Sequence, residues 1–365
     1  MQSHAAPSPA SASEKAVSPS NNFIAGETPS SLPSTMQAII ADRYGAPQSL
    51  QLRDIELPAI GDDQVLVEVG AAGLHIGDSF ATRGKPWVVR VETGWRKPKV
   101  GIPGFDLSGR VVAVGKNTQR LKPGDEVFGT TMGSCAEFAC VKEATLAHKP
   151  ASLSFEEAAA VPTSGLAALH ALRDAARVQA GQSVLINGAA GGIGTFAIQI
   201  AKSLGAEVSG VCSTSNVELL RSLGADHVLD YTQCDFTRGP QRYDVILDNV
   251  ENRSLADCRR VLAERGTLIL NSGTGAQGWA FFVRLIKPLL LSPFARQNLR
   301  RYLSLPNLAD LQVLAEMLTQ GTLRPVVGQR FPLAHTAQAI QHLETGHARG
   351  KVVVTLDNLP LGDPQ

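Results

Sequence analysis

The strongest constraint on the fold comes from residues 183–205, where an apolar run, a cluster of glycines and a helical pattern follow one another. The run at 184–186 predicts a buried parallel strand, and glycines crowd the segment 188–194 directly after it. From 193 to 204 apolar residues recur at helical spacing, and Gly205 suits the end of a helix. The sequence therefore predicts a strand, a tight glycine turn and a helix in immediate succession.

This order of elements is typical of a site for the diphosphate of a dinucleotide. Glycines let the backbone approach the phosphates, and the helix N-terminus offers free N–H groups and a partial positive charge. A purely structural tight turn is the alternative, but the flanking strand and helix favour the cofactor site. The residues predicted to contact the cofactor here are Gly188, Ala189, Ala190, Gly191, Gly192, Ile193 and Gly194.

From residue 183 onward the sequence alternates between strand and helix patterns, whereas the part before it does not. Further strands are predicted at 207–211, 227–229, 243–247 and 267–270, and helices at 216–223 and 253–263. This alternation predicts a doubly wound parallel sheet. Up to about residue 150 there are short strand patterns and turns without long helices, which predicts a β-rich domain. The last strand, at 351–355, is expected to complete that domain.

Composition limits the classes of function that the chain can have. Its 365 residues are enough for two domains, and 44% hydrophobic with 18% charged residues is typical of a globular protein. A net charge of +1 provides no overall field for nucleic acid, and no partner of that kind is expected. Five irregularly spaced cysteines indicate a reducing compartment. The sequence has no run of 18 apolar residues, so no integral membrane segment is expected.

Residues 1–35 differ in composition from the rest of the chain. They contain nine Ser, six Ala and five Pro, which favours a disordered tail that cannot bury enough apolar area to fold. A transit peptide is the alternative, but such peptides are rich in Arg and this segment has none. We therefore expect a tail at 1–35 and a cytoplasmic protein.

Several motifs in order resemble the medium-chain dehydrogenase/reductase superfamily, and most closely its zinc-free quinone oxidoreductase and alkenal reductase branch. The resemblance covers about residues 36–356 and rests on the segments 101–115, 123–129, 158–169, 188–194, 223–231 and 350–354. It implies an α/β fold, with a doubly wound parallel Rossmann sheet at 161–321. It also implies a β-rich, GroES-like catalytic domain formed by 36–160 and 322–358.

The sequence departs from the zinc-dependent members of this superfamily at the positions of the zinc ligands. Those relatives have a His-Glu pair after a glycine, whereas Phe105 and Asp106 follow Gly104 here. The two cysteine ligands are replaced by His75 and Thr163. A catalytic zinc needs three protein ligands, so no zinc is expected. Without a Lewis acid, hydride addition to quinones or conjugated carbonyls is favoured over simple alcohol oxidation.

The loop after the second strand of the Rossmann sheet bears on the choice between NADPH and NADH. NAD-selective sites place an acidic residue there to hold the ribose 2′-OH, whereas this loop offers hydroxyls and an amide from Ser213, Thr214 and Asn216. NADPH is therefore favoured over NADH. Tyr231 either lies beside the adenosine phosphate or is a packing aromatic at a strand end. The resemblance further places Asp248, Asn249, Ser272, Gly273 and Lys351 near the cofactor, although a solvated lysine at a strand start is the simpler interpretation of Lys351.

The sequence indicates which residues line a pocket for nicotinamide and substrate, but it indicates no proton donor. The resemblance places His75, Asp78, Phe105 and Thr163 there, and structural hydrogen bonding is the simpler role of His75 and Asp78. Some enoyl reductase relatives have a Tyr where Lys85-Pro86-Trp87 stand here, so water is the candidate proton source. A small hydrophobic carbonyl or quinone is the expected substrate. The alternatives are a cofactor-binding sensor with little turnover and a zinc-free alcohol or carbonyl dehydrogenase.

The segment 279–305 is apolar and basic, and its role stays open between three interpretations. It could form a lid over the pocket, a contact in a homodimer, or a segment that lies on a membrane surface.

Overall fold

The computed structural model describes residues 32–271 and 296–356, and the described residues from Pro33 onward form one compact unit. Most of the predicted tail, together with Ser272, Gly273 and most of the 279–305 segment, lies outside the described residues. The first strand, β1 (Thr35–Ile40), begins where the tail was predicted to end, and pairs with β2 (Gln51–Glu56) in a two-stranded sheet.

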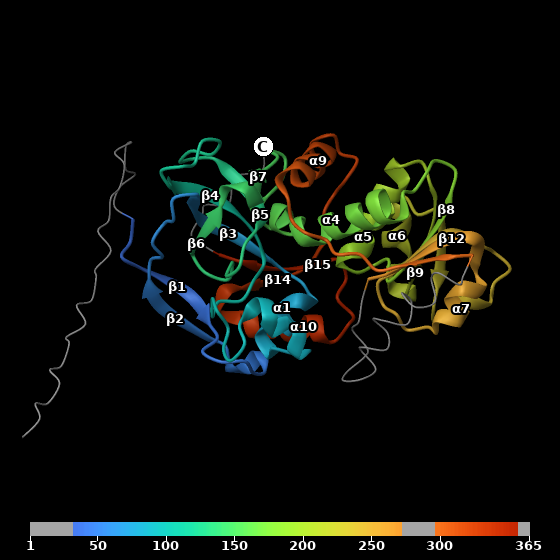
Figure 1. Cartoon of the computed structure of the whole chain (residues 1–365), viewed down its shortest axis with the longest axis horizontal. Coiled ribbons are helices and arrows are strands. Elements are labelled where there is room, and N and C mark those ends of the chain that lie inside the picture. The colour runs from blue at the N-terminus through green and yellow to red at the C-terminus, as the bar shows by residue number, and fades with distance from the viewer. Residues whose placement is uncertain (1–31, 272–295, 357–365) are drawn as a thin grey trace, which may run out of the picture. The chain divides into compact units, whose positions relative to one another are not determined.

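The predicted doubly wound sheet is present as six parallel strands in the order β10-β9-β8-β11-β12-β13 (Figure 1). When the strands are numbered from β8 along the chain, this order is 3-2-1-4-5-6. Sheets with this order bind dinucleotides at the point where the strand order reverses. The strands are β8 (Ser183–Asn187), β9 (Glu207–Cys212), β10 (His227–Asp230), β11 (Tyr243–Asp248), β12 (Leu262–Leu270) and β13 (Asn298–Arg300). The intervening helices are α5 (Gly192–Ser203), α6 (Val217–Ser222) and α7 (Leu255–Arg260).

The helix predicted at 253–263 was too long, because its last residues belong to a strand. Ser254 caps α7 by accepting a hydrogen bond from the Asp257 N–H, and the helix ends at Arg260. Leu262 then begins β12, and Tyr243 of β11 pairs with it. Buried apolar residues at 261 and 262 fit both a helical and a strand pattern, and pairing with β11 decides for the strand.

The β-rich domain is a seven-stranded sheet that combines both ends of the described chain. Its strands are β3 (Gln64–Leu74), β4 (Asp106–Val114), β5 (Glu126–Thr130), β6 (Phe138–Lys142), β7 (Leu146–His148), β14 (Val327–Pro332) and β15 (Lys351–Thr355). β15 runs antiparallel to β3, with Val352 opposite Leu74. The last strand therefore completes the β-rich domain, as expected from the sequence.

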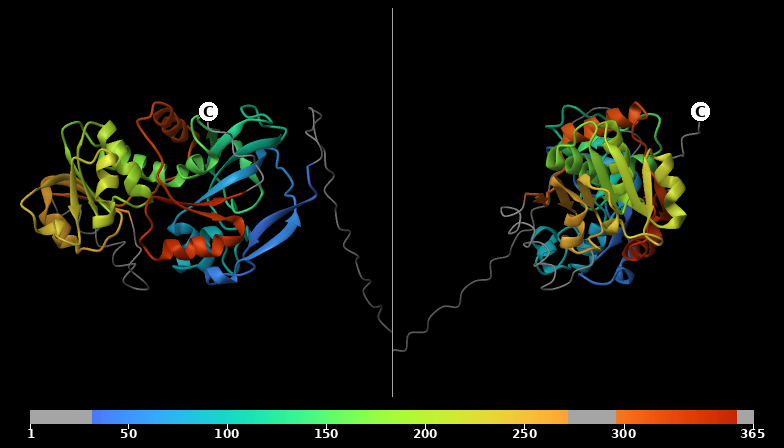
Figure 2. Two further views of the ribbon diagram at one scale, coloured as in Figure 1. Left: turned by 180° about the vertical axis from the view of Figure 1, so that it is seen from behind. Right: turned by 90° about the vertical axis from the view of Figure 1, so that its right-hand side faces the viewer.

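The remaining helices described here pack on these strands or on other helices. They are α1 (Ile76–Arg83), α2 (Arg90–Thr93), α3 (Phe155–Ala159), α4 (Pro162–Leu169), α9 (Leu308–Thr319) and α10 (Thr336–Glu344). Figure 2 shows α1 and α10 side by side, and Arg83 of α1 forms an ion pair with Glu344 of α10 at 2.6 Å. α4 packs on α5 and α9 and also contacts β4 and β5, so it lies between the β-rich strands and α5.

Candidate functional site

The glycine loop joins β8 to α5 with a backbone that only glycine adopts easily. Gly188, directly after β8, has φ +75, and a Cβ there would lie 2.7 Å from Cγ2 of Val250. Gly194, in the first turn of α5, is closer still, because its Cβ would lie 2.3 Å from the Gly188 carbonyl oxygen. These two glycines allow the turn and the close packing of helix on strand.

Gly191 has a different place in the same loop, because the space beside it is open. It is the N-cap of α5, with an ordinary φ of −80, and the nearest atom to a Cβ there would be 3.4 Å away. The fold therefore does not need a glycine at this position. An open N-cap on a 12-residue helix is where an anion could approach the free N–H groups.

The strand β15 fastens the glycine loop to the β-rich domain. The N–H of Gly350 donates to the carbonyl oxygen of Ala190 at 2.8 Å, and Gly350 pairs with Gly191 in an isolated parallel bridge. A Cβ on Gly192 would lie 3.1 Å from Cδ of Lys351 and 3.3 Å from Oγ of Ser164. The first turn of α5 therefore touches side chains of both β15 and α4.

Lys351 is buried, so its interpretation as a solvated lysine at a strand start is wrong. Its side chain is 2% exposed, and Nζ lies 3.3 Å from Oδ2 of Asp106, which is itself fully buried. The other carboxylate oxygen of Asp106 accepts from the backbone N–H of Thr163 at 3.1 Å and from its hydroxyl at 2.5 Å. Burial raises the pKa of Asp106, and the Lys351 charge and the Thr163 donors oppose that shift.

Asp106 is thus the centre of a buried cluster. The sequence interpretation considered this residue only as a replacement for a zinc ligand. The cluster joins β4, α4 and β15, which are far apart in the sequence, and it lies against the first turn of α5. The spacing of Asp106 and Lys351 along the chain gives no sign of this contact, since it depends on both strands pairing with β3.

His75 and Asp78 serve the start of α1, as the simpler interpretation expected. Nδ1 of His75 accepts from the Gly77 N–H at 2.9 Å, and Asp78 accepts from the His75 N–H at 2.7 Å. Burial, assisted by the Lys351 charge, lowers the pKa of His75 to about 3, so its ring is neutral. Burial raises the pKa of Asp78 to about 7. The His75 ring stacks on Phe105, with centroids 5.3 Å apart.

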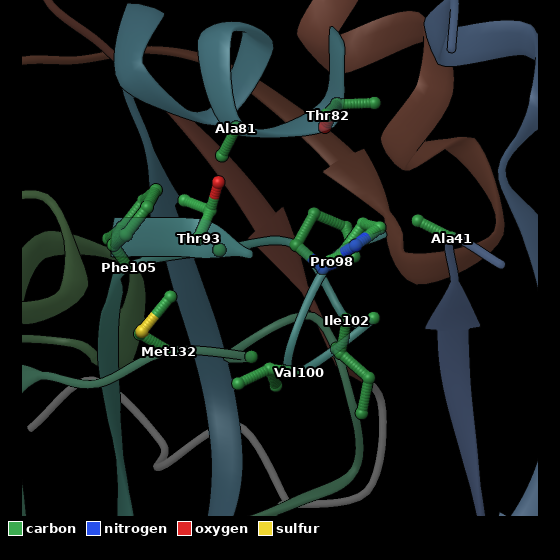
Figure 3. Close-up of a pocket in the computed structure, with 13 residues that line it drawn as sticks. Ala41, Ala81, Thr82, Thr93, Pro98, Val100, Ile102, Phe105 and Met132 are labelled. Atoms are coloured by element: carbon green, nitrogen blue, oxygen red, sulfur yellow. The ribbon is translucent and has the colours of Figure 1, made fainter. Parts of the chain in front are cut away.

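Phe105 faces an apolar pocket in the β-rich domain (Figure 3). None of the lining residues is charged, and they come from three parts of the chain. It consists of Ala41, Ala81, Thr82, Thr93, Pro98, Val100, Gly101, Ile102, Pro103, Gly104, Phe105, Met132 and Gly133. Because Phe105 is followed in the chain by Asp106, the pocket and the buried cluster share one end of β4. Such a lining suits an apolar substrate.

A carboxylate that the sequence interpretation missed lies beside the loop after β9. Asp230, at the end of the neighbouring strand β10, accepts from the Thr214 hydroxyl at 2.5 Å and from the N–H and hydroxyl of Thr232. Asn216 donates to Oγ of Ser213 at 3.0 Å. The pKa of Asp230 is lowered, chiefly by the Thr214 hydroxyl. The signal was available, since neighbouring parallel strands end at the same sheet edge.

Three other predicted contacts take distinct places. Tyr231 is 45% exposed at the end of β10, so its ring is not buried in packing. Asp248 is buried and holds the turn after β11, since it accepts from the N–H groups of Val250 and Glu251 and from the Asn187 amide. Asn249 accepts from Asn271 at 2.8 Å, while its buried Nδ2 has no hydrogen-bond partner among the described residues.

The described residues, 32–271 and 296–356, contain no group of three or more His, Cys, Asp or Glu placed to hold a metal ion. Within the same residues, no helix has the length and apolar character needed to cross a membrane.

Two family comparisons match most of the described chain. A family described as "Alcohol dehydrogenase GroES-like domain" matches residues 61–174, and one described as "Zinc-binding dehydrogenase" matches residues 223–354. The first match contains His75, Phe105 and Thr163, and the second contains Tyr231, Asp248 and Lys351.

Individual relatives match nearly the whole chain. A 2-methylene-furan-3-one reductase of Solanum lycopersicum is 34% identical, over 93% of this chain and 84% of its own length. An NADPH-dependent alkenal/one oxidoreductase of Arabidopsis thaliana, labelled chloroplastic, is 33% identical over 94% and 85%. The structure of the quinone oxidoreductase from Coxiella burnetii superimposes with a TM-score of 0.76 at 30% identity, over 88% of this chain and 99% of that one.

Proposed function

Because the chain belongs to the medium-chain dehydrogenase/reductase superfamily, in its quinone and enone reductase branch, we propose that the glycine loop binds NADPH beside the pocket at Phe105. The protein is an NAD(P)H-dependent oxidoreductase that transfers hydride to a quinone or an α,β-unsaturated carbonyl. The observation that carries the site assignment is the open N-cap at Gly191, held by β15 against the cluster of Asp106, Thr163 and Lys351.

The residues around the glycine loop fit an NADP(H) molecule. A Cβ at Gly188 would fill the space beside Asn249, and the buried Nδ2 of Asn249 is a donor without a partner among the described residues. The N-terminus of α5 would hold the diphosphate, Ser213 and Asn216 the adenosine end, and Thr163 would lie against the nicotinamide. We propose the same cofactor contacts for Thr214, Tyr231 and Asn249, and for Ser272 and Gly273 beyond the described residues. Asp248 and Lys351 would act by holding the loops.

The cofactor supplies the hydride, and the protein provides orientation and excludes water. Thr163 is fixed by donating its hydroxyl and N–H to Asp106, so its oxygen presents lone pairs in one orientation only. The Phe105 ring, stacked on a neutral His75, forms an apolar wall of the pocket. A neutral His75 that already accepts from Gly77 has no proton to give through Nδ1. We propose that a water molecule supplies the proton that completes the reduction.

An NADPH-consumption assay with a panel of enones, quinones and simple ketones tests this function. Turnover of the enones or quinones, with little on the ketones, is the expected result. A cofactor-binding sensor would bind NADPH and turn over none of the panel, whereas a zinc-free carbonyl dehydrogenase would prefer the ketones. Either of these two results would contradict the proposed reductase activity.

Introducing a carboxylate at Ser213 is expected to reverse the preference for NADPH over NADH. Ser213 begins the loop after β9, and its hydroxyl oxygen accepts a hydrogen bond from the Asn216 amide. Ser213→Asp therefore places a negative charge where the 2′-phosphate would lie. We expect kcat/KM with NADPH to fall at least about tenfold while that with NADH holds or rises. The matched variant Ser213→Asn, which adds similar bulk without charge, should change the ratio much less. A wild type that prefers NADH would contradict the assignment.

We propose that catalysis is independent of zinc. The Thr163 hydroxyl donates to Asp106 and His75 Nδ1 accepts from Gly77, so both groups are used within the fold. Asp106 is fully buried and paired with Lys351. Purified protein should hold far less than one zinc per chain by metal analysis and keep its turnover in chelator. Loss of activity in chelator that added zinc restores would overturn this proposal.

The domain boundaries, the cellular location and the oligomeric state complete the proposal. We assign residues 36–160 and 322–358 to the catalytic domain and 161–321 to the cofactor-binding domain. The seven-stranded and the six-stranded sheet, built from strands within these ranges, support this division. A cytoplasmic location is supported by the Arg-free segment 1–35, although relatives include chloroplastic and mitochondrial proteins. A homodimer is proposed from the apolar composition of 279–305, most of which lies outside the described residues.

A further inference from the structure

Residues 85–100 turn an unusual number of apolar side chains toward solvent. Single exposed apolar residues are common, but several close together mark an interaction surface. The two tryptophans also contact each other edge to face, with ring centroids 6.3 Å apart. The exposed apolar residues of the segment are Trp87 (55% exposed), Val88 (42%), Val91 (64%), Trp95 (66%) and Val100 (41%).

The same segment is basic on its exposed side. Its exposed cations are Lys85, Arg96, Lys97 and Lys99, and its single acidic residue is Glu92. This local excess of positive charge contrasts with a net charge of only +1 for the whole chain. Cations that flank exposed Trp and Val side chains are typical of surfaces that meet the headgroup region of a bilayer.

The backbone of this segment is fixed from the inner side by partly buried polar contacts. The Tyr44 hydroxyl lies 2.9 Å from Oγ1 of Thr93 and also donates to the Gly94 carbonyl oxygen. The Arg90 guanidinium lies 4.5 Å from the centre of the Tyr44 ring, and the Lys99 N–H donates to the Thr93 carbonyl at 2.7 Å. These contacts hold the backbone that carries Val91, Trp95, Lys97 and Lys99, and none of them uses the side chains of these four residues.

We propose that residues 85–100 dock on a bilayer surface that contains anionic lipid. The apolar side chains would enter the headgroup boundary, and the cations would face the lipid phosphates and carboxylates. A nucleic acid would use the cations but would leave the exposed valines in water, which makes the lipid surface the better match. A second copy of this basic segment would bring like charges together.

This surface lies at the rim of the apolar pocket, because Thr93, Pro98 and Val100 belong to both (Figure 3). Docking would turn the pocket toward the membrane, where hydrophobic quinones and long-chain enals accumulate. This consequence rests on the proposed function, whereas the docking itself does not, and the two are therefore measured separately.

Cosedimentation of the full chain with phosphatidylcholine vesicles, with and without about one-third phosphatidylserine, tests the docking surface. We expect binding to the anionic vesicles that weakens as salt rises. Lys97→Gln with Lys99→Gln should weaken it about twentyfold, and Val91→Ser with Trp95→Ser at least about tenfold. The matched charge control, Lys122→Gln with Lys142→Gln, alters two exposed lysines elsewhere and should change little.

The apolar comparison is Leu303→Ser with Leu305→Ser, which removes two exposed leucines (78% and 62%) at the end of the 279–305 segment, the other candidate for a membrane contact. Retained binding in this variant supports the assignment to 85–100. The assignment would be overturned if the leucine variant lost binding while the Val91 and Trp95 variant kept it. It would also be overturned if the wild-type protein did not bind anionic vesicles, or if it self-associated through residues 85–100. Turnover of a water-soluble enone, measured on all variants, shows separately whether the proposed function holds.

Discussion

Replacing Gly191 by Asp is expected to abolish NADPH binding while leaving the protein folded. The residue is the N-cap of α5, with an ordinary φ of −80 and no atom closer than 3.4 Å to a Cβ. Asp is a favoured N-cap, so the free energy of unfolding should change by less than about 1 kcal/mol. The new carboxylate would stand where the diphosphate approaches the helix, and affinity should fall at least about 100-fold.

Thermal unfolding and NADPH titration, measured on the same preparation, check this result. Gly191→Asn is the matched control, since it caps the helix without a charge and should lose less affinity. Gly194→Ala gives the opposite pattern, because its Cβ would lie 2.3 Å from a backbone oxygen and should destabilise the fold. A Gly191→Asp variant that binds NADPH as well as wild type would move the diphosphate site away from α5.

Replacing Lys351 by Met is expected to destabilise the protein strongly. The ammonium is the cationic partner of Asp106 at 3.3 Å, and both side chains are almost fully buried. Removing one partner leaves the other charge without compensation, which costs about 3–5 kcal/mol in buried pairs. Burial already raises the pKa of Asp106, and without Lys351 the carboxyl should take up a proton at higher pH still.

Denaturant unfolding of Lys351→Met, Asp106→Asn and the double variant separates pairing from packing. The double variant should recover part of the loss, because it leaves no unpaired charge. Stability of Lys351→Met should fall further as pH rises, since deprotonation of Asp106 is then unfavourable in the folded state alone. Equal stabilities for wild type and Lys351→Met would show that the pair does not hold β15 to β4.

The order of local elements was readable from the sequence because it is encoded by near neighbours. Apolar spacing predicts the strand at 183–187 and the helix α5. The loop between them needs glycine at 188 and 194, where a Cβ would lie too close to neighbouring atoms. The same patterns predicted the parallel sheet and the β-rich domain. Where two patterns overlapped, as at Leu262, the local signal was ambiguous, and pairing with β11 decided it.

Contacts between distant segments were decided by the tertiary structure. Lys351 and Asp106 lie 245 positions apart, and they meet because β15 and β4 pair with opposite sides of β3. Thr214 meets Asp230 because β9 and β10 end at one edge of their sheet. From residue type alone, Lys351 was interpreted as solvated, and no carboxylate was expected near Thr214. In both cases strand register placed a carboxylate within hydrogen-bond distance of its partner. Sequence spacing determines the elements of this protein, whereas sheet register determines which charged groups must be buried together.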